Sequence, residues 1–204
     1  MRSERRERGP EIRHAQFQGK FKWFIYRKGR EFERLLSELK TFGPRQFIKM
    51  LDLRWLTELL DSLENGIRTT KGADLKAIYA ANDASYPQRA KHAKYLDETR
   101  KRLSGLKKLQ GSSVVRPHML ASMVLASLHL QHKVAAFVPL YSVSRAKNVR
   151  FDRYEDSLRE LARAIDQKTD RGPLADVVSA STEGTNVKNA REVRFRYFCD
   201  LFSS

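Results

Sequence analysis

Cysteine and long apolar runs are scarce in this sequence, and acidic side chains are too few to balance the basic ones. The single cysteine, Cys199, excludes an internal disulfide framework and suits a reducing compartment. The most apolar stretch, residues 119–130, is interrupted by two serines and a histidine, which makes it too short and too polar for a membrane span. The opening residues, MRSERRERGP, have no apolar core and do not form a signal peptide. These absences predict a soluble, cytoplasmic protein with no membrane contact.

Acidic residues are outnumbered by basic ones. The 204-residue chain has 40 lysines and arginines against 24 aspartates and glutamates, a net charge of +16. The excess is concentrated in two segments: residues 1–50 hold 14 basic and 6 acidic side chains, and residues 87–116 hold 9 and 2. Segregated positive charge attracts polyanions such as nucleic acid. A generally basic solvated surface, or a surface that meets an acidic partner protein, are the alternatives.

Motifs that indicate catalysis or metal binding are also missing. The sequence has no P-loop, GxGxxG, HExxH, zinc-finger spacing or RNP motif. His129 and His132 have an i, i+3 spacing compatible with metal ligands, but no nearby carboxylate or cysteine completes a site, so we interpret them as polar edges of a core helix. Cys199 has no identifiable base beside it and is interpreted as a buried small side chain. The sequence therefore predicts no catalytic residue, no metal and no cofactor, and it favours a non-catalytic protein.

Apolar residues recur with helical spacing along almost the whole chain, and no run of alternating strands is present. Helices are expected at residues 14–40, 44–65, 73–83, 87–109, 117–134, around 151–165, and 188–202, the last capped by Asn186. Residues 169–186, rich in Gly, Ser, Thr and Asp, are expected to form a long surface loop. Segment 44–65 is apolar around most of its circumference, as buried helices are. The predicted fold is all-α, an irregular bundle of about six to eight helices around this central helix.

The domain organisation predicted from this pattern is simple. Residues 1–12 are expected to form a charged, disordered arm, because they contain almost no apolar side chain. Residues 13–204 are expected to form one all-α domain, a length sufficient to bury a substantial core.

Segment 20–36, KFKWFIYRKGREFERLL, combines aromatic and basic side chains on two helical faces. Three of its rings point to the core and need no ligand. Two rings, Trp23 and Tyr26, fall on the outer face beside Arg27, Arg30 and Arg34. Aromatic rings beside arginines stack on bases or line a protein interface, and a second packing contact within the domain is the alternative.

Two further helices contribute basic residues. The predicted nucleic-acid contacts are Arg27, Arg30, Arg34, Lys91, Lys94, Arg100, Lys101, Arg102, Lys107, Lys108, Arg191 and Arg194, with Trp23 and Tyr26 as a stacking or partner face. The residues of segment 87–109 surround their helix, so only some of them can contact one phosphate track.

The stretch NGIRTTKGADLKAIYAANDASYPQRAKHAKYLDETRKRL resembles the helical part of a prokaryotic family of unknown function, typified by the ParB-like N-terminal region of GmrSD-type, modification-dependent restriction enzymes. The matching positions follow the family's "ELL…L..GI…K…L…Y…D..FP.R" pattern and are Glu58-Leu59-Leu60, Gly66-Ile67, Lys71, Leu75, Tyr79, Asp83, Tyr86-Pro87 and Arg89. The resemblance extends over about residues 14–202, and most matched positions are core or turn residues.

One departure limits what the resemblance implies. The family's activity is linked to an upstream domain with an Asp-Gly-Gln-Gln-Arg-like motif, and the only Gln-Arg pair here, Gln88-Arg89, lies in a different region. The chain is similar to the helical half alone, as in a split or truncated member. The resemblance therefore implies a setting in restriction or anti-phage defence, and it implies no catalytic residue.

Two hypotheses of different classes follow from the sequence. In the first, the chain is a helical module that contacts DNA or RNA through its basic helices. In the second, it is an interaction subunit whose Trp23/Tyr26 face binds a separate ParB-like or nuclease partner. A truncated remnant without activity is the third possibility.

Overall fold

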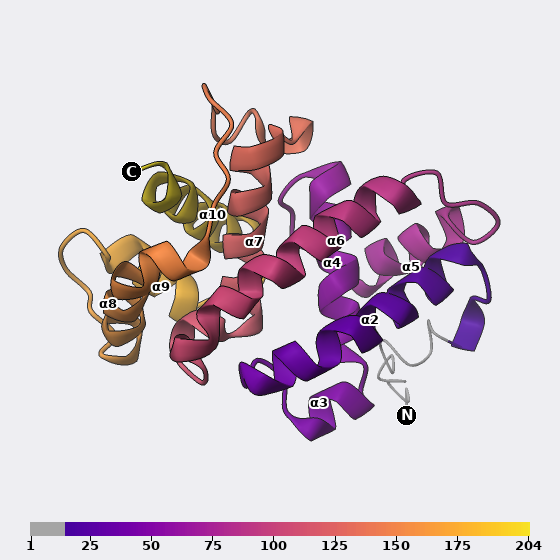
Figure 1. Cartoon of the computed structure of the whole chain (residues 1–204), viewed down its shortest axis with the longest axis horizontal. Coiled ribbons are helices and arrows are strands. Elements are labelled where there is room, and N and C mark those ends of the chain that lie inside the picture. The colour runs from indigo at the N-terminus through magenta and orange to yellow at the C-terminus, as the bar shows by residue number, and fades with distance from the viewer. Residues whose placement is uncertain (1–14) are drawn as a thin grey trace, which may run out of the picture.

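The computed structural model describes residues 15–204, and these residues form a bundle of α-helices without a β-strand (Figure 1). The nine α-helices of this part of the chain are α2 (Lys20–Glu38), α3 (Pro44–Ile48), α4 (Leu51–Asn65), α5 (Gly72–Ala81), α6 (Arg89–Leu103), α7 (Pro117–His132), α8 (Glu155–Asp166), α9 (Ala175–Thr182) and α10 (Lys188–Ser203). Short 3₁₀ turns lie at η1 (Ser104–Leu109), η2 (Ser113–Val115), η3 (Ala135–Phe137) and η4 (Phe151–Tyr154). The all-α prediction is confirmed.

The predicted central helix, 44–65, is two helices rather than one. The break lies at Met50, whose backbone is in the left-handed region with φ of 51°. Helix α3 buries none of its residues, and Ile48 at its end is 76% exposed. Because α3 has no buried face, the prediction of a single buried helix over 44–65 is wrong, although α4 is buried as expected.

Helix α7 shares the centre of the bundle with α4. All residues from 122 to 130 are buried, and the helix packs against α4, α6 and α10 (Figure 1). The serines of this stretch bond back to the helix, as Ser127 Oγ does to the Val124 carbonyl at 2.8 Å, and His129 Nε2 meets the Tyr141 carbonyl at 2.8 Å. Small polar side chains that return to the backbone allow a helix to be buried on every side.

The C-terminal third of the chain differs from the prediction at two places. The loop predicted at 169–186 contains helix α9, which buries Val177 and Val178 against the core and packs on α8 and α10. Asn186 does not cap α10, because the N-cap position is Val187 and no side chain makes a capping bond there. Asn186 instead lies in the wall of a pocket described below.

Helices α2 and α6 lie side by side and run in the same direction (Figure 1). Lys28 Nζ of α2 meets Asp97 of α6 at 2.8 Å, and further along the chain Glu38 of α2 meets Lys107 of η1 at 3.7 Å. The predicted helix 87–109 ends at Leu103 and continues as the tighter turn η1. This arrangement places the basic residues of α6 and η1 next to the C-terminal half of α2.

A second junction joins α4, α7 and α10. Trp55 Nε1 of α4 donates to the carbonyl of Pro117, the first residue of α7, at 2.9 Å. Arg191 of α10 donates to Ser62 Oγ of α4 at 2.9 Å. These bonds connect three helices that are distant in the sequence, and a pocket lies where they meet.

Buried apolar side chains of all major helices form one continuous cluster. The predicted arm at residues 1–12 lies outside the described residues, and the assignment of 13–204 to one domain stays a prediction. Among residues 15–204, no helix is both long and apolar enough to cross a membrane.

Candidate nucleic-acid interface and an arginine-lined pocket

A groove of about 280 Å³ runs between the C-terminal half of α2 and the end of α6 with η1. Its lining residues are Glu31, Arg34, Leu35, Glu38, Arg100, Lys101, Ser104 and Lys107. Four of the predicted nucleic-acid contacts therefore come together from two segments that are about sixty residues apart in the sequence. We call this feature the α2–α6 groove.

The charges in the α2–α6 groove are unbalanced. Arg100 and Lys101 are exposed and have no ion-pair partner among the described residues, whereas Arg34 and Lys107 share Glu38 at 2.8 and 3.7 Å. The hydrogen bond from Arg34, together with the charge of Lys107, holds the pKa of Glu38 below its usual value. Four cations therefore face two carboxylates, and exposed ion pairs of this kind exchange partners at little cost.

Two more predicted contacts lie on the same two helices. Arg27 of α2 and Lys94 of α6 are exposed and have no ion-pair partner in the described part of the chain. Each lies about two turns N-terminal to a cation of the groove, Arg34 and Lys101 respectively. They extend the basic surface along both helices.

The face predicted around Trp23 and Tyr26 is divided between two sides of α2. Arg34 belongs to the α2–α6 groove, whereas Tyr26 and Arg30 line a separate groove against α3 and α4. Arg30 pairs with Glu33 at 3.7 Å. The outer face predicted for α2 is therefore not one surface in the folded protein, because its residues line two different grooves.

Trp23 and Tyr26 are exposed, at 51% and 40%, and their rings meet edge to face with centroids 6.1 Å apart. Trp23 Nε1 donates to the Gln18 carbonyl at 3.1 Å, so the indole is held in place. Together with Ile48 on α3, these side chains give the molecule an apolar exposed area beside α2. Apolar and aromatic groups on a surface are typical of protein interfaces.

Lys91 and Lys108 are exposed but lie outside the α2–α6 groove. Lys91 pairs with Glu64 at 3.0 Å, and Lys108 pairs with Glu155 at 3.0 Å. The positive charge of each lysine is therefore opposed by a carboxylate, whereas those of Arg100 and Lys101 are not.

The prediction that Arg102 and Arg194 contact nucleic acid is wrong, because both are buried. Arg102 is 7% exposed and donates to the Val149 carbonyl at 3.3 Å and to Gln131. Arg194 is 1% exposed and donates to the carbonyls of Ala180 and Thr185. These guanidinium groups bind backbone carbonyls of loops and of the last turn of α9, which have no further turn of helix to donate to them.

Arg191 is half-buried and also serves an internal contact. Its Nη1 donates to the Arg68 carbonyl at 2.5 Å and to Thr70 Oγ1 at 3.1 Å. The prediction that Arg191 contacts nucleic acid on an outer surface is therefore also wrong, because its side chain faces the junction of α4 and α10.

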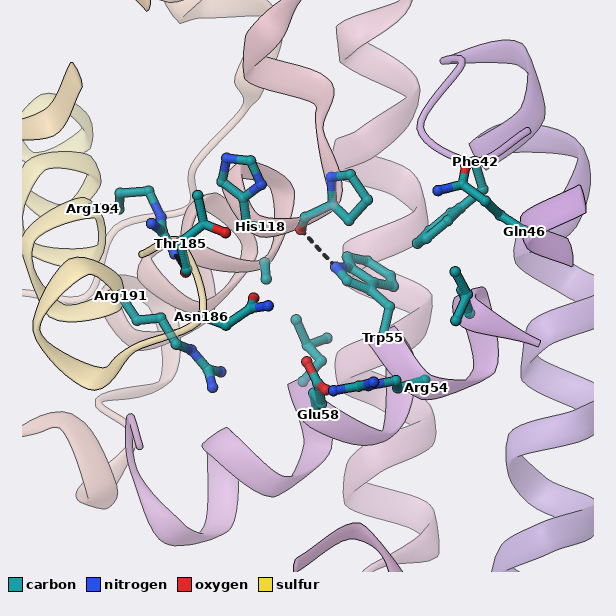
Figure 2. A pocket seen from close by; sticks show the side chains of 14 residues that line it. Phe42, Gln46, Arg54, Trp55, Glu58, His118, Thr185, Asn186, Arg191 and Arg194 are labelled. Carbon is teal, nitrogen blue, oxygen red and sulfur yellow. Dashed lines mark hydrogen bonds and ion pairs between the residues drawn. The ribbon is translucent and has the colours of Figure 1, made fainter. Parts of the chain in front are cut away.

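The pocket at the junction of α4, α7 and α10 has a volume of about 240 Å³. It is lined by Phe42, Gln46, Leu51, Arg54, Trp55, Glu58, Leu59, Pro117, His118, Ala121, Thr185, Asn186, Arg191 and Arg194. Figure 2 shows Arg191 and Asn186 extending from one side toward Arg54, Glu58 and Trp55 on α4. We call it the arginine pocket.

His118 adds a neutral polar group to the arginine pocket. Burial, followed by the positive charges of Arg194 and Arg116, lowers the pKa of His118 to about 4. Its Nε2 atom is buried and has no hydrogen-bond partner among the described residues. The imidazole is therefore uncharged at neutral pH and keeps one unused hydrogen-bonding atom.

A carboxylate–imidazole–hydroxyl chain lies elsewhere, between α4 and α6. His92 Nε2 is 2.8 Å from Glu64 Oε1, and its Nδ1 bonds the Tyr86 hydroxyl. Burial raises the pKa of Tyr86, so the hydroxyl retains its proton, and burial lowers the pKa of His92. This geometry provides no activated nucleophile; it joins the start of α6 to the end of α4.

Sequence reasoning missed the arginine pocket. The i, i+3 spacing of Arg191 and Arg194 indicated a shared face, but nothing in α10 alone shows that the face is buried. Asn186 was interpreted as a helix cap, and His118 was not singled out. The partners of these residues come from α4, α7 and the segment before α10, which only the fold brings together.

Comparison with protein-family models, with curated proteins and with solved structures found no match to this chain.

Proposed function

We propose that this protein is a non-catalytic helical module that contacts the backbone of nucleic acid through the α2–α6 groove. The observation that supports this most is the convergence of Arg34, Arg100, Lys101 and Lys107 from two helices into one groove with an excess of positive charge. Phosphate contacts by lysine and arginine supply most of non-specific nucleic-acid affinity. The setting we propose, a cytoplasmic restriction or anti-phage defence system of a prokaryote, rests on the family resemblance of the sequence.

The groove favours backbone contacts over base recognition. None of its lining residues is aromatic, so bases have no ring on which to stack. Its cations are long side chains at the solvent boundary, which follow phosphates without fixing a sequence. We therefore expect similar affinity for different sequences of equal length.

The experiment compares two double charge reversals in the full chain. Arg100→Glu with Lys101→Glu alters the groove, whereas Lys71→Glu with Lys76→Glu makes the same charge change at exposed positions near α5. Neither Lys71 nor Lys76 lines the groove, and α5 is not among the elements that form it.

Binding is measured by fluorescence anisotropy with a labelled duplex of about 20 base pairs and with the matching single strands, over a salt series from about 50 to about 200 mM. We expect wild-type affinity to fall steeply with salt. We expect the groove variant to bind at least about tenfold more weakly, with a slope of log affinity against log salt shallower by about 2. Equal losses in the two variants, or no measurable wild-type binding at low salt, contradict the proposal.

A second function is favoured by a different observation, the exposed Trp23, Tyr26 and Ile48 beside α2. On this proposal the chain is an interaction subunit that binds a separate ParB-like nucleotide-handling or nuclease protein. Trp23→Ala then abolishes capture of that partner, while affinity for the duplex stays within about twofold of wild type. If Trp23→Ala leaves capture intact, this second proposal fails. Absence of both duplex binding and partner capture in the wild-type chain would favour a remnant without function.

A further inference from the structure

Two guanidinium groups of α10 approach the arginine pocket without a carboxylate partner. Arg194 and Arg191 each make three hydrogen bonds, and every acceptor is a backbone carbonyl or a hydroxyl. A guanidinium has five N–H groups, so each side chain retains two. Buried cations are normally paired with an anion, because their desolvation is costly. The protein supplies no such anion to either arginine within ion-pair distance among the described residues.

The remaining charges of the pocket do not cancel this excess. Glu58 pairs with Arg54 at 2.7 Å, so its negative charge is already opposed. With Arg54, Arg191 and Arg194 against Glu58, the lining has a net charge of +2. A ligand that matches this value is a dianion, such as a phosphate group attached through one ester oxygen.

The uncharged donors of the pocket suit the same group. The Asn186 amide and the Thr185 hydroxyl lie on the α10 side with Arg191 (Figure 2). Asn186 makes no hydrogen bond to another described residue. Convergence of two arginines with an amide and a hydroxyl provides enough donors for the three terminal oxygens of a phosphate.

The opposite wall of the pocket has an apolar part beside Arg54, Glu58 and Gln46 (Figure 2). Trp55 and Phe42 meet edge to face, with ring centroids 6.5 Å apart, and Pro117 and Leu59 complete this side. Such a wall accommodates a flat apolar body beside the charged group. A volume of about 240 Å³ is too small for a nucleic-acid strand and is close to the lower end for small-molecule sites.

We propose that the arginine pocket binds a small phosphomonoester, with its phosphate on Arg191, Arg194 and Asn186 and its apolar body against Trp55 and Phe42. The pocket shares no lining residue with the α2–α6 groove. The inference is therefore independent of the proposed function, and either can fail without the other.

The test uses tryptophan fluorescence in the full chain. The protein has two tryptophans, so a Trp23→Phe background leaves Trp55, which lines the pocket, as the single reporter. Phenyl phosphate is the probe, compared with benzoate as a monoanion, benzyl alcohol as a neutral analogue, and inorganic phosphate. We expect a saturable change with phenyl phosphate, about tenfold weaker binding of benzoate, and still weaker binding of benzyl alcohol.

Three variants locate the binding site. Ala121→Leu fills the pocket without removing a charged group, and Asn186→Ala removes one donor at an exposed position. Asn189→Ala, also exposed on α10 but absent from the pocket, is the matched control. We expect Ala121→Leu to abolish binding, Asn186→Ala to weaken it about five- to tenfold, and Asn189→Ala to leave it unchanged.

Clear outcomes overturn the inference. No saturable signal up to about 10 mM phenyl phosphate, by fluorescence and by calorimetry, excludes the ligand class. Equal affinity for benzyl alcohol and phenyl phosphate shows an apolar pocket in which the arginines serve the fold alone. Binding that survives Ala121→Leu places the ligand elsewhere. The Arg100→Glu, Lys101→Glu variant should bind phenyl phosphate as wild type does, which separates this site from the groove.

Discussion

The α2–α6 groove and the arginine pocket are both built from basic side chains, yet they use them in opposite ways. Arg100 and Lys101 are exposed and unpaired at the surface, whereas Arg194 is buried and bonded to backbone carbonyls. Exposed cations contribute little to stability and are available to an external anion. Buried ones stabilise the fold through hydrogen bonds to groups that lack other partners, and only their remaining N–H groups are available to a ligand. The residue type alone does not decide between these roles; the acceptors within reach of the side chain do.

Substitution of the buried arginine should give the largest effect on stability. Arg194→Met leaves the carbonyls of Ala180 and Thr185 without their donors, and we expect the free energy of unfolding to fall by about 3 kcal/mol. Arg100→Met, an exposed position, should change it by less than about 0.5 kcal/mol. Urea unfolding followed by circular dichroism measures both. Similar losses of unfolding free energy in the two variants would contradict the distinction between buried and exposed arginines.

The pH dependence of stability should show the second-largest effect, through His118. Its folded pKa of about 4 is below the ordinary value of 6.5, so the unfolded chain binds the proton more readily. The stability that the folded protein has with His118 uncharged is fully present above about pH 6.5 and is lost as the pH falls toward 4. The free energy of unfolding lost over this range is on the order of 3 kcal/mol.

The control for this prediction is His118→Gln, which removes the titrating group from the arginine pocket. Its free energy of unfolding should fall less steeply than that of wild type between about pH 6.5 and pH 4. Parallel pH profiles for the two proteins would show that the environment of His118 does not oppose its charge.

Lys28 is an intermediate case that sharpens the comparison. Its ammonium is largely buried between α2 and α6 and pairs with Glu31 at 2.7 Å and Asp97 at 2.8 Å. Lys28→Met should lower the free energy of unfolding by about 1 kcal/mol, because both carboxylates keep partial access to water. It also leaves Glu31 unneutralised in the groove, so duplex affinity should fall about two- to threefold. Unchanged affinity would indicate that the duplex does not approach this part of α2.

The smallest expected effect belongs to Glu38, the carboxylate shared by Arg34 and Lys107. Glu38→Gln removes one of the two negative charges of the groove, and duplex affinity should rise about two- to threefold at low salt, with a slightly steeper salt slope. Glu160→Gln, at an exposed glutamate of α8, makes the same change outside the groove and should leave affinity unchanged. Weaker binding by Glu38→Gln would argue against a phosphate contact at Arg34 and Lys107.

The sequence predicted most of the helices because an apolar stripe is a local property. Helix α2 follows the spacing of its phenylalanines and leucines, and these residues are buried as that spacing indicates. Helix α9 was missed because ADVVSAST is short and rich in residues typical of loops, and two valines decide its packing. The break at Met50 was missed because the residues on both sides of it are apolar.

The candidate sites were predictable only in part, for a related reason. Exposure of Lys101 follows from its position opposite Leu96 and Leu103 on α6, whereas Arg100 lies at the edge of that buried face and its exposure does not follow from the spacing. Arg194 lies among apolar neighbours of α10, and its acceptors belong to α9 and the segment after it, which no local pattern reveals. The arginine pocket depends on three distant segments, so it became visible only in the folded chain.

The central claim, that the α2–α6 groove meets nucleic acid, is tested most directly by acetylation of lysines with and without a bound duplex, read by mass spectrometry. Lys101 and Lys107 line the groove, whereas Lys71 and Lys76 are exposed near α5 and serve as internal controls. We expect the duplex to lower acetylation of Lys101 and Lys107 several-fold and to leave that of Lys71 and Lys76 unchanged. Uniform protection of all four lysines, or protection of Lys71 and Lys76 alone, would contradict it.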